Sequence, residues 1–339
     1  MSIASVLIAL VPVVVFLVML FFMDRFRLVR PDAVVIAIVC GAAAAGVSLW
    51  INRQFLQALN IPSGVVTRLL APLVEEAVKA IPLIVWLKRG RVGFLVDAAI
   101  LGFAVGTGFA LVENVQYLSA MSGSLALWVV RGFGTAMLHG GTTAIFAMMA
   151  TTAADRHSSR SGVAFMNGWL AAVIIHAGFN YQLLPAVAQT LMILIALPLL
   201  MLWVFSRSER AMAEWIGAGL DLDVDLLQLI NSDVFEGTRM GRYLHELRNR
   251  LPGTVVADMF CLLRLELELA VQAKGMLMAR EAGVRVDTDA DFDALVTEHD
   301  SLQRSIGRAG LLALKPLQVS SRRDRWHRHV LQVGRATER

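Results

Sequence analysis

The chain has 339 residues, of which 57% are hydrophobic and only 17% are charged. Soluble domains carry about 25% charged residues, so this composition indicates a membrane protein and excludes an ordinary soluble enzyme. The net charge of +4 does not indicate a nucleic-acid partner, because the basic residues of the apolar part lie in short loops, where they set membrane topology.

Seven apolar windows are long enough to cross the hydrocarbon layer of a membrane, which needs about 20 helical residues. In chain order they cover residues 3–23, 33–51, 69–87, 94–118, 132–153, 163–184 and 186–205. We expect the first window to be a retained span, since it follows no basic start and contains no obvious small-residue cleavage site. The sequence therefore predicts an all-α fold, a polytopic membrane helix bundle with about seven spans.

The loops between these windows alternate in charge. Those after the first, third, fifth and seventh windows are basic, whereas those after the fourth and sixth carry no basic residue; Arg53 and Arg68 are the exceptions. Because basic loops stay in the cytoplasm, we expect the N-terminus outside and the C-terminus inside the cell.

The C-terminal part of the chain has a different character. Residues 1–206 contain 12 Lys and Arg and 7 Asp and Glu, which leaves 19 and 20 for residues 207–339. In the latter part, apolar residues recur at three- and four-residue spacing. We therefore predict a transmembrane helical domain over 1–206 and a cytoplasmic helical domain, regulatory or docking, over 207–339. The basic cluster at 320–329 is interpreted as a solvated or lipid-facing tail.

Ionisable residues inside membrane spans mark functional sites by default, and four successive windows contain them. In each window an ionisable residue has a polar or charged partner four positions later, on the same helix face. The set consists of Glu75, Glu76 and Lys79; Glu113, Asn114 and Tyr117; His139 and Thr143; and His176 and Asn180.

These residues are also predicted to lie at one depth. With a rise of about 1.5 Å per residue, the carboxylates and histidines fall roughly 7–13 Å below the outer surface. Four helices would therefore bring three carboxylates and two histidines together. Lys79 is placed to neutralise either Glu75 or Glu76.

These carboxylates and histidines are suited to peptide hydrolysis. A carboxylate in a low-dielectric pocket can act as general base on water, and a histidine with an amide such as Asn180 can stabilise the oxyanion. We assign the base to Glu76 or Glu75, and Glu113 with His139 completes the pocket. A metal is the alternative, because two histidines and a glutamate match a catalytic zinc set; its ligands would be Glu113, His139 and His176. The chain has no HExxH motif, so the prediction of a zinc site rests on composition alone.

The motifs EEAVK, ENVQY, HGGTT and HAGFN follow one another on four predicted helices, starting at Glu75, Glu113, His139 and His176. In this order they resemble the PrsW family of bacterial intramembrane proteases, which is distantly similar to the CAAX prenyl endopeptidases. The resemblance covers roughly residues 60–185. It implies a multi-pass enzyme of the bacterial inner membrane that cuts a membrane-anchored protein, such as an anti-sigma factor, near the extracytoplasmic face.

The resemblance also implies roles for individual residues. The catalytic candidates are Glu75, Glu76, Glu113, His139 and His176, and the supporting residues are Lys79, Tyr117, Thr143 and Asn180, with Asn114 beside them. The expected partners are a membrane-anchored protein substrate and membrane lipid.

Two other functions remain open on the sequence. Buried carboxylates and histidines also build proton or divalent-cation paths in transporters, but the inner halves of the same windows are nearly bare of polar groups. A non-catalytic membrane scaffold that binds substrates without cutting them is the third reading.

Overall fold

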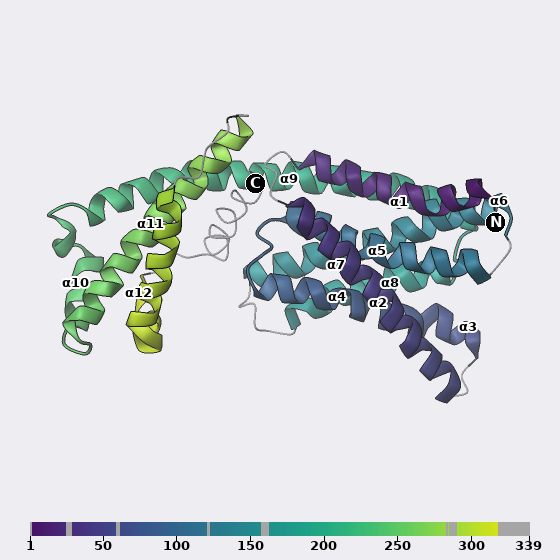
Figure 1. Cartoon of the computed structure of the whole chain (residues 1–339), viewed down its shortest axis with the longest axis horizontal. Helices are drawn as coiled ribbons and strands as arrows, with labels where there is room; N and C mark the ends of the chain where they lie inside the picture. Colours follow the sequence, from purple (N-terminus) through teal and green to yellow (C-terminus); the bar gives the residue numbers. More distant parts are fainter. Residues whose placement is uncertain are drawn as a thin grey trace. The chain divides into compact units, whose positions relative to one another are not determined.

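The computed structural model describes residues 2–24, 29–58, 62–120, 123–156, 163–282, 284 and 290–317 (Figure 1). Within these ranges all regular structure is helical, which confirms the all-α prediction. The chain forms two compact units, Met1–Glu209 and Arg210–Arg339. The division lies close to the predicted boundary after residue 206.

Every predicted window of the first unit contains helical residues. The segments are α1 (Ile3–Met23), α2 (Pro31–Ala58), α3 (Ser63–Val65), η1 (Val66–Leu70), α4 (Ala71–Lys88), α5 (Leu95–Ala120), α6 (Leu125–Val129), η2 (Val130–Thr135), α7 (Ala136–Arg156), α8 (Val163–Asn180) and α9 (Ala186–Ile230). Two of them, η1 and η2, are π-helical turns that run directly into α4 and α7. Such turns occur often at functional sites.

Four helices of the described chain are long and apolar enough to cross a membrane: α1, α2, α5 and α9. The protein is therefore a multi-pass membrane protein. The other three predicted windows are helical but do not belong to these four; α4, for instance, contains four charged residues. The count of seven spans stays a prediction.

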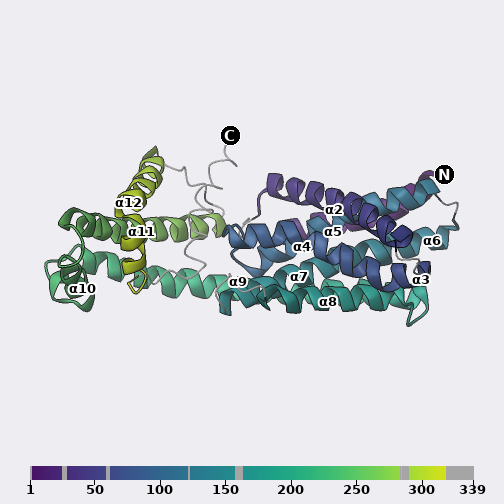
Figure 2. The ribbon, with the colours of Figure 1, turned by 90° about the horizontal axis from the view of Figure 1, so that it is seen from below.

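Helix α5 is the centre of the first unit. It packs against α7 and α2 (Figure 2) and also against α1. Of its most apolar stretch 83% is buried, against 22% for α1. Small residues permit this packing, because they let helix backbones approach closely. A Cβ atom on Gly102 would meet the backbone of α7 at Thr143 and Ala144, and one on Gly108 would meet the backbone of α2 at Ile38.

At Gly106 the backbone of α5 lies close to the backbone of α7 at His139, one of the predicted site residues. A Cβ atom there would collide with the carbonyl oxygen of His139 and the Cα atom of Gly140. We expect Gly106→Ala to force α5 and α7 apart and to reduce the free energy of unfolding by about 1–3 kcal/mol, the usual cost of overpacking.

Thermal unfolding in detergent measures this effect, with Gly46→Ala as the control. A Cβ atom on Gly46 would meet nothing within 4 Å beyond its own helix backbone, so alanine there should leave stability unchanged or raise it by about 0.5–1 kcal/mol. Equal unfolding temperatures for the two variants would refute the close-packing argument.

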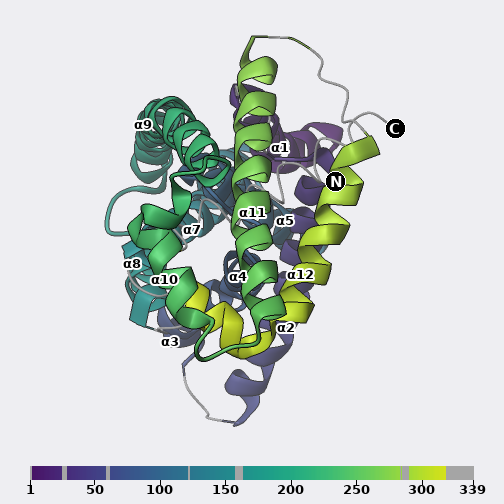
Figure 3. The same ribbon diagram turned by 90° about the vertical axis from the view of Figure 1, so that its left-hand side faces the viewer.

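The second unit is helical as well, as its spacing of apolar residues predicts. Its elements after α9 are η3 (Phe235–Gly237), α10 (Arg239–Leu247), α11 (Gly253–Glu281) and α12 (Ala290–Leu314). Helix α11 packs against α12 and α10 (Figure 3), around a core that includes Met259, Leu262 and Leu314. The basic cluster at 320–329 lies outside the described residues.

Candidate functional site

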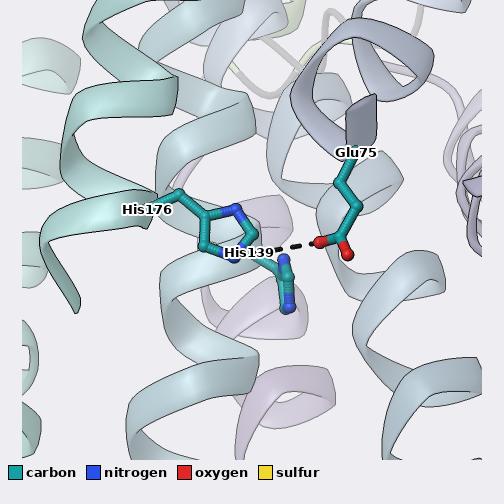
Figure 4. Close-up of side chains that lie close together, drawn as sticks. All are labelled: Glu75, His139 and His176. Atoms are coloured by element: carbon teal, nitrogen blue, oxygen red, sulfur yellow. Dashed lines mark ion pairs between the residues drawn. The ribbon is translucent and has the colours of Figure 1, made fainter. Parts of the chain in front are cut away.

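Three ionisable side chains from three helices meet inside the first unit. Glu75 comes from α4, His139 from α7 and His176 from α8. Figure 4 shows them directed toward one another. One ligand atom from each lies within 4.8 Å of the other two, and His176 Nε2 is 3.8 Å from Glu75 Oε2. These three residues are called the Glu–His–His cluster below.

Glu76 supports the cluster and has several partners of its own. Its Oε1 atom accepts hydrogen bonds from Lys79 Nζ at 2.6 Å and from Thr142 Oγ1 at 3.2 Å. It also lies 2.8 Å from Nδ1 of His176. Since a carboxylate accepts, we assign the Nδ1 proton to His176, which leaves its Nε2 atom free to face Glu75.

His139 has a partner on each ring nitrogen. Its Nδ1 atom lies 3.2 Å from Lys79 Nζ, and its Nε2 atom lies 3.0 Å from Glu113 Oε2. Because the lysine ammonium only donates, Nδ1 is the acceptor and Nε2–H donates to Glu113. The ring also packs against Phe109 and, edge to face, against His176, each at 4.8 Å between centroids. His139 is therefore fixed in orientation.

Glu75 is the least constrained carboxylate of the site. Its side chain is 13% exposed, against 1% for Glu76. Besides its approach to His176, it accepts a long hydrogen bond of 3.5 Å from Asn52 Nδ2 on α2. A carboxylate held so loosely keeps lone pairs available for a water molecule, a metal ion or a substrate.

The remaining predicted supporting residues lie around the cluster without joining it. Asn114 Nδ2 donates to the carbonyl of Ala9 at 2.7 Å, and the Tyr117 ring lies under Arg131. Thr143 Oγ1 donates to the His139 carbonyl, within its own helix. The amide of Asn180 donates to the Thr67 carbonyl at 3.1 Å. This last contact gives the Asn180 amide a backbone partner on η1, and its expected role at the oxyanion stays a prediction.

Three contacting residues were not singled out by the sequence. Thr142 bonds to Glu76, Asn52 bonds to Glu75, and Arg131 pairs with Glu113 at 3.0 Å. Arg131 looks like a membrane-boundary charge in the sequence, and Asn52 lies beside the boundary residue Arg53. The spacing rule that selected Thr143 favours residues four positions after His139, whereas Thr142 reaches across to another helix.

The two neighbouring threonines allow a matched test of the Glu76 contacts. Thr142→Val keeps the shape of the side chain but removes a hydrogen bond to a buried carboxylate, so we expect a loss of about 1.5–3 kcal/mol in the free energy of unfolding. Thr143→Val removes only a bond to the backbone of its own helix and should cost clearly less. Thermal unfolding of both variants checks this, and a larger effect at Thr143 would contradict it.

The donor atoms of the Glu–His–His cluster fit a divalent metal if the Nδ1 atom of His139 exchanges its contact with Lys79 for the metal. Two imidazole nitrogens and one carboxylate oxygen form the ligand set of many catalytic zinc sites. Metal-binding histidines usually give their other N–H to a carboxylate or carbonyl, as His176 does to Glu76. The three groups whose ligand atoms lie close together include Glu75, where the sequence suggested Glu113. Glu113 contacts His139 and Arg131.

Comparison with known proteins places this site in a family. Residues 29–205, more than half of the chain, match the model of the PrsW family of intramembrane metalloproteases. The matched segment contains α4, α5, α7 and α8 and hence every residue of the cluster. Searches of curated proteins and of solved structures gave no significant match. The matched residues include the segment, roughly 60–185, whose motifs resemble this family. The chain belongs to the PrsW family of intramembrane metalloproteases.

Proposed function

We propose that the protein hydrolyses a peptide bond of a membrane-anchored protein near the extracytoplasmic face, with the Glu–His–His cluster as its reaction centre. The observation that carries this proposal is the convergence of Glu75, His139 and His176 from three helices. Each histidine is oriented by a separate glutamate, Glu76 or Glu113. Such preorganisation is what general acid–base or metal-assisted hydrolysis requires.

The position along the helices supports cleavage near one membrane surface. Glu75 follows Arg68 by seven residues and His139 follows Arg131 by eight, about 10–12 Å below the outer ends that the sequence predicts for these spans. His176 precedes the end of α8 at Asn180 by four. With the topology inferred from loop charges, seven spans and an external N-terminus, this end of the bundle faces the outside of the cell. Residues 207–339 then lie in the cytoplasm, as a regulatory or docking domain.

The chain's own groups can perform the proton transfers. Glu75, with free lone pairs and partial exposure, is placed to take a proton from an attacking water molecule and to give it to the leaving amine. Lys79 neutralises Glu76, so that a second negative charge beside Glu75 is compensated. The backbone and side chains that bury the site keep out other water.

If a metal is bound, Glu75, His139 and His176 would hold it, with His139 using the Nδ1 atom that contacts Lys79 here. The metal would supply Lewis-acid activation of water and of the carbonyl. Glu75 would then be a ligand and not the base. Glu76 and Glu113 keep the same task in either case, because they fix the two imidazole rings.

The substrate we propose is a single-span membrane protein, such as an anti-sigma factor. Co-expression of the protein with a library of the host's single-span membrane proteins tests this, with wild type beside a variant that carries both Glu75→Gln and His176→Ala. New fragments that appear only with wild type support the protease and identify its substrate. Identical fragment patterns would overturn it, and liposome assays of cation flux would then examine the transporter reading.

A further inference from the structure

Arg131 is an arginine that the protein holds largely inside the membrane-spanning unit, with a side chain only 11% exposed. It lies in η2, the π-helical turn that leads into α7 and His139. Its guanidinium carbon lies 3.6 Å from the centre of the Tyr117 ring, and its Nε atom donates to Asn114 Oδ1 at 3.0 Å. Its Nη2 atom lies 3.0 Å from Glu113 Oε2. All three partners belong to α5.

The oxygen of Glu113 that faces Arg131 is also the one that faces His139. Oε2 is 3.0 Å from Nη2 of the arginine and 3.0 Å from Nε2 of the histidine. The contact with Nη2 is a close ion pair without hydrogen-bond alignment. The arginine charge therefore compensates the carboxylate while the carboxylate orients the imidazole. Removal of one member of this largely buried pair leaves the charge of the other uncompensated, which is unfavourable.

Helix α1 supports this arrangement from outside the family-matched residues. Asn114, which accepts from Arg131, donates its own amide to the carbonyl of Ala9 on α1 at 2.7 Å. The residue after Arg131 is Gly132, where a Cβ atom would collide with the carbonyl oxygen of Ile8. Helix α1 thus contacts α5 at Asn114 and the turn that carries Arg131 at Gly132. The family match begins at residue 29, so α1 lies outside the matched segment.

We infer that Arg131 is a positioning residue that holds Glu113 against His139, and that α1 completes this support through Ala9 and Asn114. The inference rests on the proposed role of the Glu–His–His cluster as the reaction centre. Residues that orient a metal-binding histidine change metal affinity by about 10- to 100-fold when they are replaced. Arg131 acts one step further out, so the lower end of this range applies.

The test is calorimetric titration of the full-length protein in detergent with Zn²⁺. We expect Arg131→Met to bind zinc about tenfold more weakly than wild type. Arg131→Lys should lie between them, because an ammonium can pair with Glu113 but cannot reproduce the fixed geometry of a guanidinium bonded to Asn114. Asn114→Ala should weaken binding in the same direction. Arg207→Met is the matched control, since Arg207 also lies over an aromatic ring, Trp203, but is exposed and far along the chain from the site.

The outcomes separate this inference from the proposed function. Equal zinc affinity of wild type and Arg131→Met overturns the inference alone, even if the variant unfolds at a lower temperature. If Arg131→Met does not fold, Arg131→Lys and Asn114→Ala decide in the same way. If wild type cuts a substrate without binding zinc, a lower kcat at unchanged KM in these variants supports the inference, and an unchanged kcat overturns it. If wild type neither binds zinc nor cleaves a substrate, both the inference and the proposed function are overturned.

Discussion

Replacement of Glu75 by glutamine is expected to lower the rate of peptide-bond cleavage by about 100-fold or more while the protein keeps its fold. Glutamine has the same shape but can neither take a proton from water nor offer a carboxylate to a metal, and general acid–base groups contribute roughly 10²- to 10⁴-fold. The fold should survive because Glu75 makes only a long hydrogen bond to Asn52 and a distant pair with His176. Initial cleavage rates of the identified substrate and thermal unfolding measure the two effects.

Glu76→Gln provides the contrast to this variant. Glu76 binds Lys79, Thr142 and His176 through a single oxygen, so its replacement should lower stability as well as activity. Full cleavage by Glu75→Gln would exclude Glu75 as base or ligand. Zinc titration of the same variant distinguishes the two roles: a ligand's loss abolishes binding, whereas the loss of a base leaves it nearly intact.

Replacement of Lys79 by methionine is expected to have the largest effect on stability. Lys79 is completely buried, lies 2.6 Å from Glu76 Oε1 and 4.8 Å from the centre of the Phe109 ring, and also contacts His139. Methionine fills the space but leaves a buried carboxylate without its cation. The loss in the free energy of unfolding should be about 3–5 kcal/mol, as for other broken buried pairs. Denaturation in mixed micelles measures it.

A second substitution tests whether the cost comes from the unpaired charge. The double variant Lys79→Met with Glu76→Gln removes both charges, and we expect it to be more stable than Lys79→Met alone. Lys88→Met, at the exposed end of α4, is the control and should change stability by less than about 0.5 kcal/mol. Additive losses in the double variant would mean that the cost of Lys79→Met does not come from the unpaired charge of Glu76.

The contacts around Glu113 also bear on how α1 takes part in the enzyme. Because Asn114 connects Ala9 with Arg131, a shift of α1 would be transmitted to the residue that orients His139. Changes at the N-terminus of the chain are therefore expected to act on the reaction centre, even though no α1 residue belongs to the Glu–His–His cluster.

Much of the fold could be predicted from the sequence because it depends on local properties. The length of an apolar stretch decides whether a helix can span a membrane, and helices occupy all seven predicted windows. The order of the motifs led to the PrsW family, which the family match shows independently. Residues such as His139 and His176 stood out because an ionisable group in an apolar helix needs compensation.

Which of these residues meet one another could be decided only by the tertiary structure. Spacing leaves Lys79 equally able to reach Glu75 or Glu76, and the structure pairs it with Glu76. Composition suggested Glu113 with the histidines as a metal set. The three groups whose ligand atoms lie within 4.8 Å of one another are Glu75, His139 and His176, and Glu113 faces His139 and Arg131.

The physical reason is that contacts between helices depend on the rotation of each helix about its axis and on its neighbours. The π-helical turns η1 and η2 alter that rotation just before α4 and α7, and a helical pattern in the sequence does not reveal them. The sequence by itself determined the helices, their apolar character and the residues that require partners. Only the packing of α4, α5, α7 and α8 decided which partner each of them has.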